Sequence, residues 1–192
     1  MTQSNPLINY LEAFGDISPD EKELIRSTFS FKSFKEGENL CKVGEVCREM
    51  NFICKGVLKI FIPNENGDDQ IHFFLKENQF CSILNSFTNQ IPANGTIGAA
   101  CDAEVIALPY KNLMNIYQKL PYLKTRIDEI IQRSLLDKID LRNSYLGQDA
   151  TTRYKNFLVR QPDIALRVSL GDIASYLGVT QQSLSRIRKN IA

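Results

Sequence analysis

The stretch SLGDIASYLGVTQQSLSRIRKNI, residues 169–191, decides which fold and function the sequence predicts. Its first half carries an apolar stripe at helical spacing, formed by Leu170, Ile173, Ala174 and Leu177. Gly178 then allows the backbone to turn sharply, and Thr180 is a residue type that caps the start of a helix. The helix that follows can bury Leu184 and Ile187. The stretch therefore predicts two short helices joined by a tight turn.

The outer face of the second predicted helix is polar and basic, without an acidic residue. Its candidate DNA-binding residues are Thr180, Gln181, Gln182, Ser183, Ser185, Arg186, Arg188 and Lys189. Glutamine can bond the edge of adenine and arginine that of guanine, whereas serine, threonine and lysine can hold phosphates. A solvated helix at a chain end can also carry such charges. The small Ala174, the glycine turn, the cap and the basic face occur together, however, which favours a helix-turn-helix that binds double-stranded DNA.

The distribution of charge agrees with this interpretation, although the net charge of the 192 residues is only +1. Residues 1–149 contain 16 basic and 20 acidic side chains, whereas residues 150–192 contain seven basic and two acidic ones. Such a change of sign indicates that the C-terminal part meets a polyanion while the rest of the chain has another task.

Between Phe29 and about Leu108 the pattern changes to short strands separated by turn residues. The runs VLKIFI (57–62) and QIHFFL (70–75) lie on either side of the turn NENGDD (64–69) and predict a β-hairpin. Many short strands at this spacing predict an antiparallel barrel or roll. The fold class is therefore α+β, with helices before and after an antiparallel β-roll.

Residues 121–146 predict one long helix, roughly 39 Å at 1.5 Å per residue. Its apolar residues recur every three or four positions, and they are Leu123, Ile127, Ile130, Ile131, Leu135 and Ile139. These six residues can pack on the chain's own core, or they can form the interface of a dimer through paired helices. The length of the helix slightly favours the dimer interface, and we expect a homodimer.

The sequence gives no support for a metal, a cofactor or an enzyme. The cysteines Cys41, Cys47, Cys54, Cys81 and Cys101 form no CxxC pair, and in a chain without a leader we expect them to be reduced and mostly packed. The only histidine, His72, is predicted in mid-strand beside Phe73, where a surface or core role is far more common than ligation. No GxSxG, HExxH or P-loop motif is present.

Without a leader or an apolar run of about 18 residues, we expect a cytoplasmic protein that has no membrane partner.

The stretch DIASYLGVTQQSLSRIRK (172–189) resembles the helix-turn-helix of the cyclic-AMP receptor protein and fumarate-nitrate regulator (Crp/Fnr) family of bacterial transcription regulators. The resemblance extends to the family's cyclic-nucleotide-binding roll through FKEGENLCKVGEV (34–46), GVLKIFI (56–62), GDDQIHFFL (67–75) and NQF (78–80). It implies a sensor roll in residues 1–115, a dimerisation helix and linker in residues 116–148, and a helix-turn-helix domain in residues 149–192.

The predicted recognition helix departs from the family pattern in two respects. Gln181 and Gln182 stand where the family has an Arg-Glu pair, whereas Arg186 matches a later arginine, so the usual operator sequence is not implied. The family continues into a β-hairpin wing, and because this chain ends at Ala192 we expect the recognition helix to work without one.

The family's nucleotide-binding cassette is degenerate in this chain. Aligned on Phe80, the family's Gly-Glu pair falls on Ser82 and Ile83, and its phosphate-binding Arg falls on Ala93. A carboxylate for the ribose and an arginine for the cyclic phosphate are therefore missing, and no Lys or Arg occurs between Lys76 and Lys111. The whole degenerate cassette comprises Phe80, Ser82, Ile83, Leu84, Ala93 and Asn94. We expect no cyclic AMP binding and either a pocket for an apolar or neutral ligand or a vestigial cassette that only packs.

These observations predict a homodimeric, sequence-specific DNA-binding transcription regulator. The alternative is a module of the same fold, effector-binding or vestigial, that acts through a protein partner. RNA polymerase and an unidentified small-molecule effector are further partners that the resemblance allows.

Overall fold

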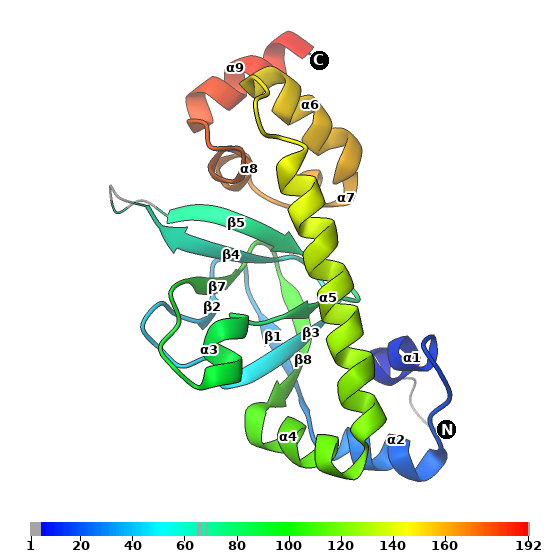
Figure 1. The fold of residues 1–192 in the computed structure, drawn as a ribbon. Coiled ribbons are helices and arrows are strands. Elements are labelled where there is room, and N and C mark those ends of the chain that lie inside the picture. The colour runs from blue at the N-terminus through cyan, green and yellow to red at the C-terminus, as the bar shows by residue number, and fades with distance from the viewer. Residues whose placement is uncertain (1–4, 65–66, 68, 192) are drawn as a thin grey trace.

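In the computed structural model, residues 5–64, 67 and 69–191 are described, and Figure 1 shows their arrangement. The chain begins with two short helices, α1 (Pro6–Glu12) and α2 (Pro19–Arg26). Ser18 caps α2 by accepting from the Glu21 N–H, and the Glu21 carboxylate accepts from the Ser18 N–H. This reciprocal pair satisfies backbone donors that the first turn of a helix otherwise leaves unbonded.

The described strands form two four-stranded antiparallel sheets that face each other as a β-roll. The strands are β1 (Ser30–Phe34), β2 (Asn39–Cys41), β3 (Glu49–Lys55), β4 (Leu58–Pro63), β5 (Asp69–Leu75), β6 (Phe80–Cys81), β7 (Thr96–Ala99) and β8 (Ala103–Pro109). One sheet has the order β1-β8-β3-β6 and the other β2-β7-β4-β5. The predicted α+β fold with an antiparallel roll is confirmed.

The predicted hairpin is formed by β4 and β5, with Ile60 opposite Phe73 and Pro63 opposite Asp69. At its turn the Gly67 N–H donates to the Asn64 carbonyl, and Gly67 has a φ of +84°, which favours glycine. Residues 65, 66 and 68 of the predicted turn lie outside the described residues.

Large apolar side chains form the buried core of the roll and of the helices packed on it. Phe52 and Ile53 of β3, Ile97 of β7 and Ile106 of β8 are all 0% exposed. Two helices, α3 (Leu84–Asn89) and α4 (Tyr110–Lys119), flank the strands. The boundary expected between residues 115 and 116 falls inside α4.

The long helix α5 (Pro121–Asn143) runs along the roll toward the C-terminal helices and ends three residues before the predicted limit. Leu123, Ile127 and Ile130, which the sequence assigns to a dimer interface, are buried within the chain itself. They are only 2%, 2% and 6% exposed, because this part of α5 lies against the roll and packs into its core.

Farther along the helix, Leu135 is 36% exposed and Ile139 is 50% exposed. Only the second half of α5 therefore presents an apolar surface.

The C-terminal part consists of α6 (Ala150–Arg160), α7 (Pro162–Ala165), α8 (Leu170–Leu177) and α9 (Gln181–Ile191). Asp149 caps α6, so this helix begins where the C-terminal domain was expected to begin. Phe157 of α6 and Leu184 of α9 are 0% exposed and belong to a second apolar cluster, which also includes Ile71 and Phe74 of β5. The C-terminal helices thus share their core with the roll.

Cys41 and Cys47 form a disulfide, so the expectation that all cysteines are reduced is wrong for this pair. A turn at Gly44, which has a φ of +85°, separates the two residues and brings their Cα atoms to 5.9 Å. Cys81 is fully buried as a free thiol, and Cys54 and Cys101 are half-buried free thiols.

Candidate DNA-binding and ligand-binding sites

The turn between α8 and α9 has the local structure that the sequence predicts. Gly178 ends α8 with φ +66° and ψ +40°, a left-handed conformation that costs glycine little. The Val179 N–H donates to the Ala174 carbonyl at 3.0 Å, which closes the end of the helix. The Ser183 N–H then donates to Thr180 Oγ1 at 3.1 Å, so Thr180 is the predicted N-cap of α9.

The outer face of α9 is open to solvent. Its exposed side chains are Gln181, Gln182, Ser183, Arg186, Arg188 and Lys189, and Ser185 is half-buried. Within the described residues, neither the glutamines nor the three basic side chains take part in a hydrogen bond or ion pair. α8 lies between α9 and β5, so the roll does not cover this face (Figure 1). These side chains are free to contact bases or phosphates.

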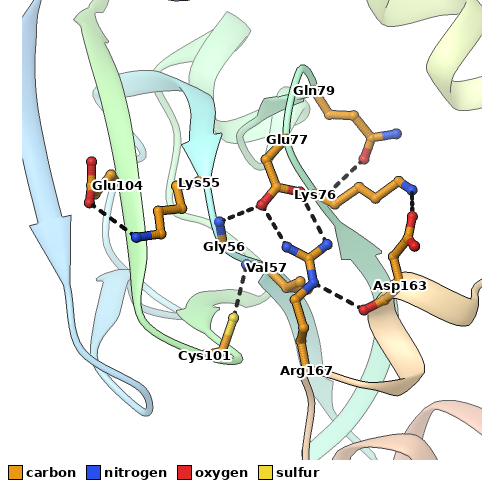
Figure 2. Close-up of polar contacts among 10 residues, drawn as sticks. All are labelled: Lys55, Gly56, Val57, Lys76, Glu77, Gln79, Cys101, Glu104, Asp163 and Arg167. Atoms are coloured by element: carbon orange, nitrogen blue, oxygen red, sulfur yellow. Dashed lines mark hydrogen bonds and ion pairs between the residues drawn. The ribbon is translucent and has the colours of Figure 1, made fainter.

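Glu77, in the turn after β5, fastens the C-terminal helices to the roll (Figure 2). Its carboxylate accepts from both terminal nitrogens of Arg167, at 2.6 and 3.1 Å, and from the Gly56 N–H at 2.7 Å. Burial alone raises the pKa of Glu77, but these hydrogen bonds outweigh burial and leave the pKa lowered. Beside it, Lys76 donates to Asp163 at 2.7 Å and lowers the pKa of that exposed carboxyl.

A second polar contact between the roll and the C-terminal helices involves strands β4 and β5. Lys59 of β4 pairs with Asp172 of α8 at 2.6 Å, and both side chains are less than 20% exposed. The Ser175 hydroxyl of α8 donates to the Asp69 carbonyl and accepts from the Ile71 N–H. α8 is thus held on the edge strand β5 by hydrogen bonds and by apolar packing.

The predicted degenerate cassette lies at the start of α3. Ile83, at the N-cap of α3, offers no capping side chain, and it is 8% exposed. The Ser82 hydroxyl donates to the Glu49 carbonyl instead of pointing to an anion site. Ala93 is 4% exposed. No carboxylate or guanidinium stands at these positions.

Five of the six cassette residues line a cavity of 440 Å³ between the roll and α5, namely Phe80, Ser82, Ile83, Leu84 and Asn94. Ala93 is buried without lining this cavity. Strands β4 and β5 contribute Ile60, Ile62, Phe73 and Leu75, and α5 contributes Ile130, Ile131 and Leu135. Most of the wall is therefore apolar, as is usual for a site that takes a small organic ligand.

The structure adds charged residues that the sequence interpretation missed. Arg133 and Lys138 of α5 both line the cavity, although no basic residue lies near the cassette in sequence. Lys138 Nζ donates to Ser134 Oγ at 2.9 Å, and burial lowers the pKa of Lys138. The sequence contained one indication of Lys138. Ile131, Ser134 and Lys138 are three and four residues apart, which places them on one face of a helix.

His72 is half-buried at the edge of the Phe73 ring, and burial, together with the charge of Arg142, lowers the pKa of its imidazole. Among the described residues, no three potential metal ligands come together. In the part of the chain that the structure describes, no helix is both long enough and apolar enough to cross a bilayer.

Comparisons with known proteins connect this geometry to a family. Residues 31–120 match the family model of the cyclic nucleotide-binding domain. The chain is 24% identical over 168 residues to the fumarate and nitrate reduction regulatory protein of Vibrio cholerae, covering 81% of this chain and 66% of that protein. It is 22% identical over 156 residues to the cAMP-activated global transcriptional regulator CRP of Salmonella typhimurium, covering 76% and 74%. The chain thus spans about two thirds to three quarters of these relatives.

Solved structures with the same fold include FixK2 from Bradyrhizobium japonicum, with a TM-score of 0.72 and 17% identity over 85% of this chain and 84% of that one. The c-di-GMP responsive global regulator CLP of Xanthomonas campestris has a TM-score of 0.70 and 14% identity, covering 88% and 89%. At these identities the structures show the shared fold.

Proposed function

Because the chain belongs to the Crp/Fnr family of transcriptional regulators, we propose that it is a homodimer that binds double-stranded DNA at specific sequences. The observation that carries the proposal is the outer face of α9. Gln181, Arg186 and Lys189 are exposed there and have no protein partner within the described residues. The capped, glycine-terminated turn fixes α9 relative to α8, as a helix that enters the major groove requires.

The second half of α5 supports the homodimer. Leu135, Leu136 and Ile139 are 36%, 63% and 50% exposed, and Ile139 follows Leu136 by three residues and Leu135 by four, so it lies beside both on the helix surface. Burying such a stripe against its copy removes apolar surface from water. A two-fold dimer places two copies of α9 on half-sites about one helical turn apart, roughly 34 Å.

The roll acts, in this proposal, as a sensor that does not bind cyclic AMP. The Salmonella relative is cAMP-activated by its name. In this chain Ile83 and Ala93 provide neither a carboxylate for a ribose nor a guanidinium for a phosphate. The cassette positions themselves therefore supply no partner for a buried phosphate, which is costly to bind without one.

The relatives are transcriptional regulators, and we propose RNA polymerase as a further partner of the DNA-bound dimer. Selection of binding sites from random DNA duplexes at fixed salt tests the proposal. We expect enrichment of palindromic sites whose half-sites are about one helical turn apart. Recovery of no palindromic preference would contradict it and would favour a module that acts through a protein partner.

A further inference from the structure

We infer that the cavity between the roll and α5 binds a small amphipathic acid. Lys138 holds its carboxylate, and the apolar walls from β4, β5 and α3 hold its hydrocarbon body. The inference rests on the proposed function, since it names the class of effector that a sensor roll of this kind reads.

The size and lining of the cavity define the body of the ligand. Its 440 Å³ falls within the range of roughly 300–1,000 Å³ for small-molecule sites. Ile60, Ile62 and Phe73 line it from adjacent strands and remain only half-buried, although they are apolar. An occupant that covers these side chains removes apolar surface from water. The body of the ligand is therefore hydrocarbon, aliphatic or aromatic, with few polar groups.

Lys138 defines the head of the ligand. Its ammonium has three donors, and within the described residues the single polar contact is to Ser134 on the same helix. None of the described ion pairs includes Lys138. Lys138 is half-buried, and an ammonium in that setting without an ion-pair partner is destabilised, which a carboxylate in the cavity would relieve.

The neighbouring groups do not supply the missing anion. The Cys81 thiol interacts electrostatically with Lys138, but burial raises the pKa of Cys81 to about 12, so the thiol stays neutral. Asp137 acts electrostatically on Lys138, but it is exposed and none of the described ion pairs joins the two; the exposed Arg133, which also lines the cavity, carries the opposite charge to Asp137. Glu77 also lines it, with its carboxylate engaged by Arg167. One positive charge remains, and it matches a monocarboxylate rather than a dianionic phosphate.

Three probes with an eight-carbon chain differ in their polar group, so they separate the effect of that group's charge from the effect of the hydrocarbon chain. Calorimetric titration of the full chain with octanoate, 1-octanol and octylamine should give the tightest binding for octanoate. We expect octanol to bind at least about tenfold more weakly and octylamine more weakly still, because only octanoate pairs with the ammonium. Equal affinities for octanoate and octanol, or no binding of octanoate, would overturn the inference.

Variants of Lys138 test its role directly. Lys138→Met should weaken octanoate binding at least about tenfold and leave octanol binding unchanged, whereas Lys138→Arg should retain the preference for octanoate. Lys124→Met is the matched control, because Lys124 lies on the same helix, pairs with Asp128 and does not line this cavity. Unchanged octanoate binding by Lys138→Met contradicts the inference. So does a change in oligomeric state of that variant in sedimentation, because it would assign Lys138 to the dimer interface.

The same protein samples distinguish this inference from the proposed function. If octanoate fails to bind while the unliganded chain still binds palindromic DNA, only the ligand class is wrong. If the chain binds neither palindromic nor random DNA but binds octanoate through Lys138, the proposed function fails and the ligand site remains.

Discussion

Gln181 and Arg186 differ from Lys189 in what each side chain can contact on a DNA duplex. Gln181 at the start of α9 and Arg186, five residues later, can read base edges, whereas Lys189 lies toward the end of the helix and can hold a phosphate. Gln181→Ala or Arg186→Ala should cost about 1–3 kcal/mol on the preferred site and little on random DNA.

Lys189→Ala is the contrasting variant. It should weaken binding to both kinds of DNA alike and reduce the salt slope by about one. Fluorescence anisotropy with both duplexes measures these effects. If Gln181→Ala and Lys189→Ala behave alike, α9 does not read sequence.

Glu77 makes the contact between the roll and the C-terminal helices sensitive to acid. Its pKa in the folded protein lies below the ordinary value of 4.5. The Glu77 carboxylate therefore contributes stability above about pH 4.5, and that contribution is lost as pH falls through the lower, folded-state pKa. We expect Glu77→Gln to have a lower Tm than the parent at neutral pH, with the difference shrinking as the pH falls below 4.5 and through the lowered, folded-state pKa of Glu77. A difference in Tm that is independent of pH would contradict this assignment.

Single residues could be predicted from sequence where their interactions are local. The Thr180 cap, the Gly178 turn and the reciprocal Ser18–Glu21 pair each join residues close in sequence, and all three are confirmed. Lys138 could not be assigned in this way, because its role depends on where α5 crosses the roll.

At the scale of secondary structure, α5 has two halves with different surroundings. Leu136 and Ile139 belong to the exposed half. The double variant Leu136→Glu, Ile139→Glu should place like charges across a two-fold interface and give monomers in sedimentation. Val159→Glu is the matched control, since Val159 is 79% exposed but lies on α6. A double variant that sediments as the parent does would remove α5 from the interface.

The periodicity of α5 could predict a helix but not the partner of each half. Leu123 and Ile127 repeat with the same spacing as Leu135 and Ile139, yet the first two are buried by the roll. Helical spacing shows which residues share a face of the helix. Only the position of the roll shows which part of that face is buried and which part stays exposed. The Cys41–Cys47 disulfide escaped prediction for a similar reason, because it depends on the geometry of the turn at Gly44.

The start of α3 leads to a prediction about nucleotides. Ile83 and Ala93 leave the cassette without a carboxylate and a guanidinium, so titration calorimetry should detect no micromolar binding of cyclic AMP or cyclic GMP. Micromolar affinity for either nucleotide would show that other groups, with Lys138 and Arg133 the first candidates, replace the missing ones.

At the scale of the whole molecule, one chain combines a cavity, a long helix and the basic surface of α9 that we propose faces DNA. Glu77 lines the cavity and also accepts from Arg167, so the proposed ligand site and the C-terminal part of the chain share a residue. Residues 1–149 have an excess of acidic side chains and residues 150–192 an excess of basic ones, which agrees with the proposal that only the C-terminal part binds DNA. We propose above all that the basic surface of α9 binds DNA.

The most direct test is the affinity of the full chain for a selected palindromic duplex as a function of salt concentration, measured by fluorescence anisotropy. If Arg186, Arg188 and Lys189 of both copies meet DNA, log Kd should rise linearly with log salt concentration, with a slope of about 0.9 for each phosphate neutralised. A steep rise between low and moderate salt is the predicted result. An affinity that does not change over this range, or no measurable binding at low salt, would contradict the account.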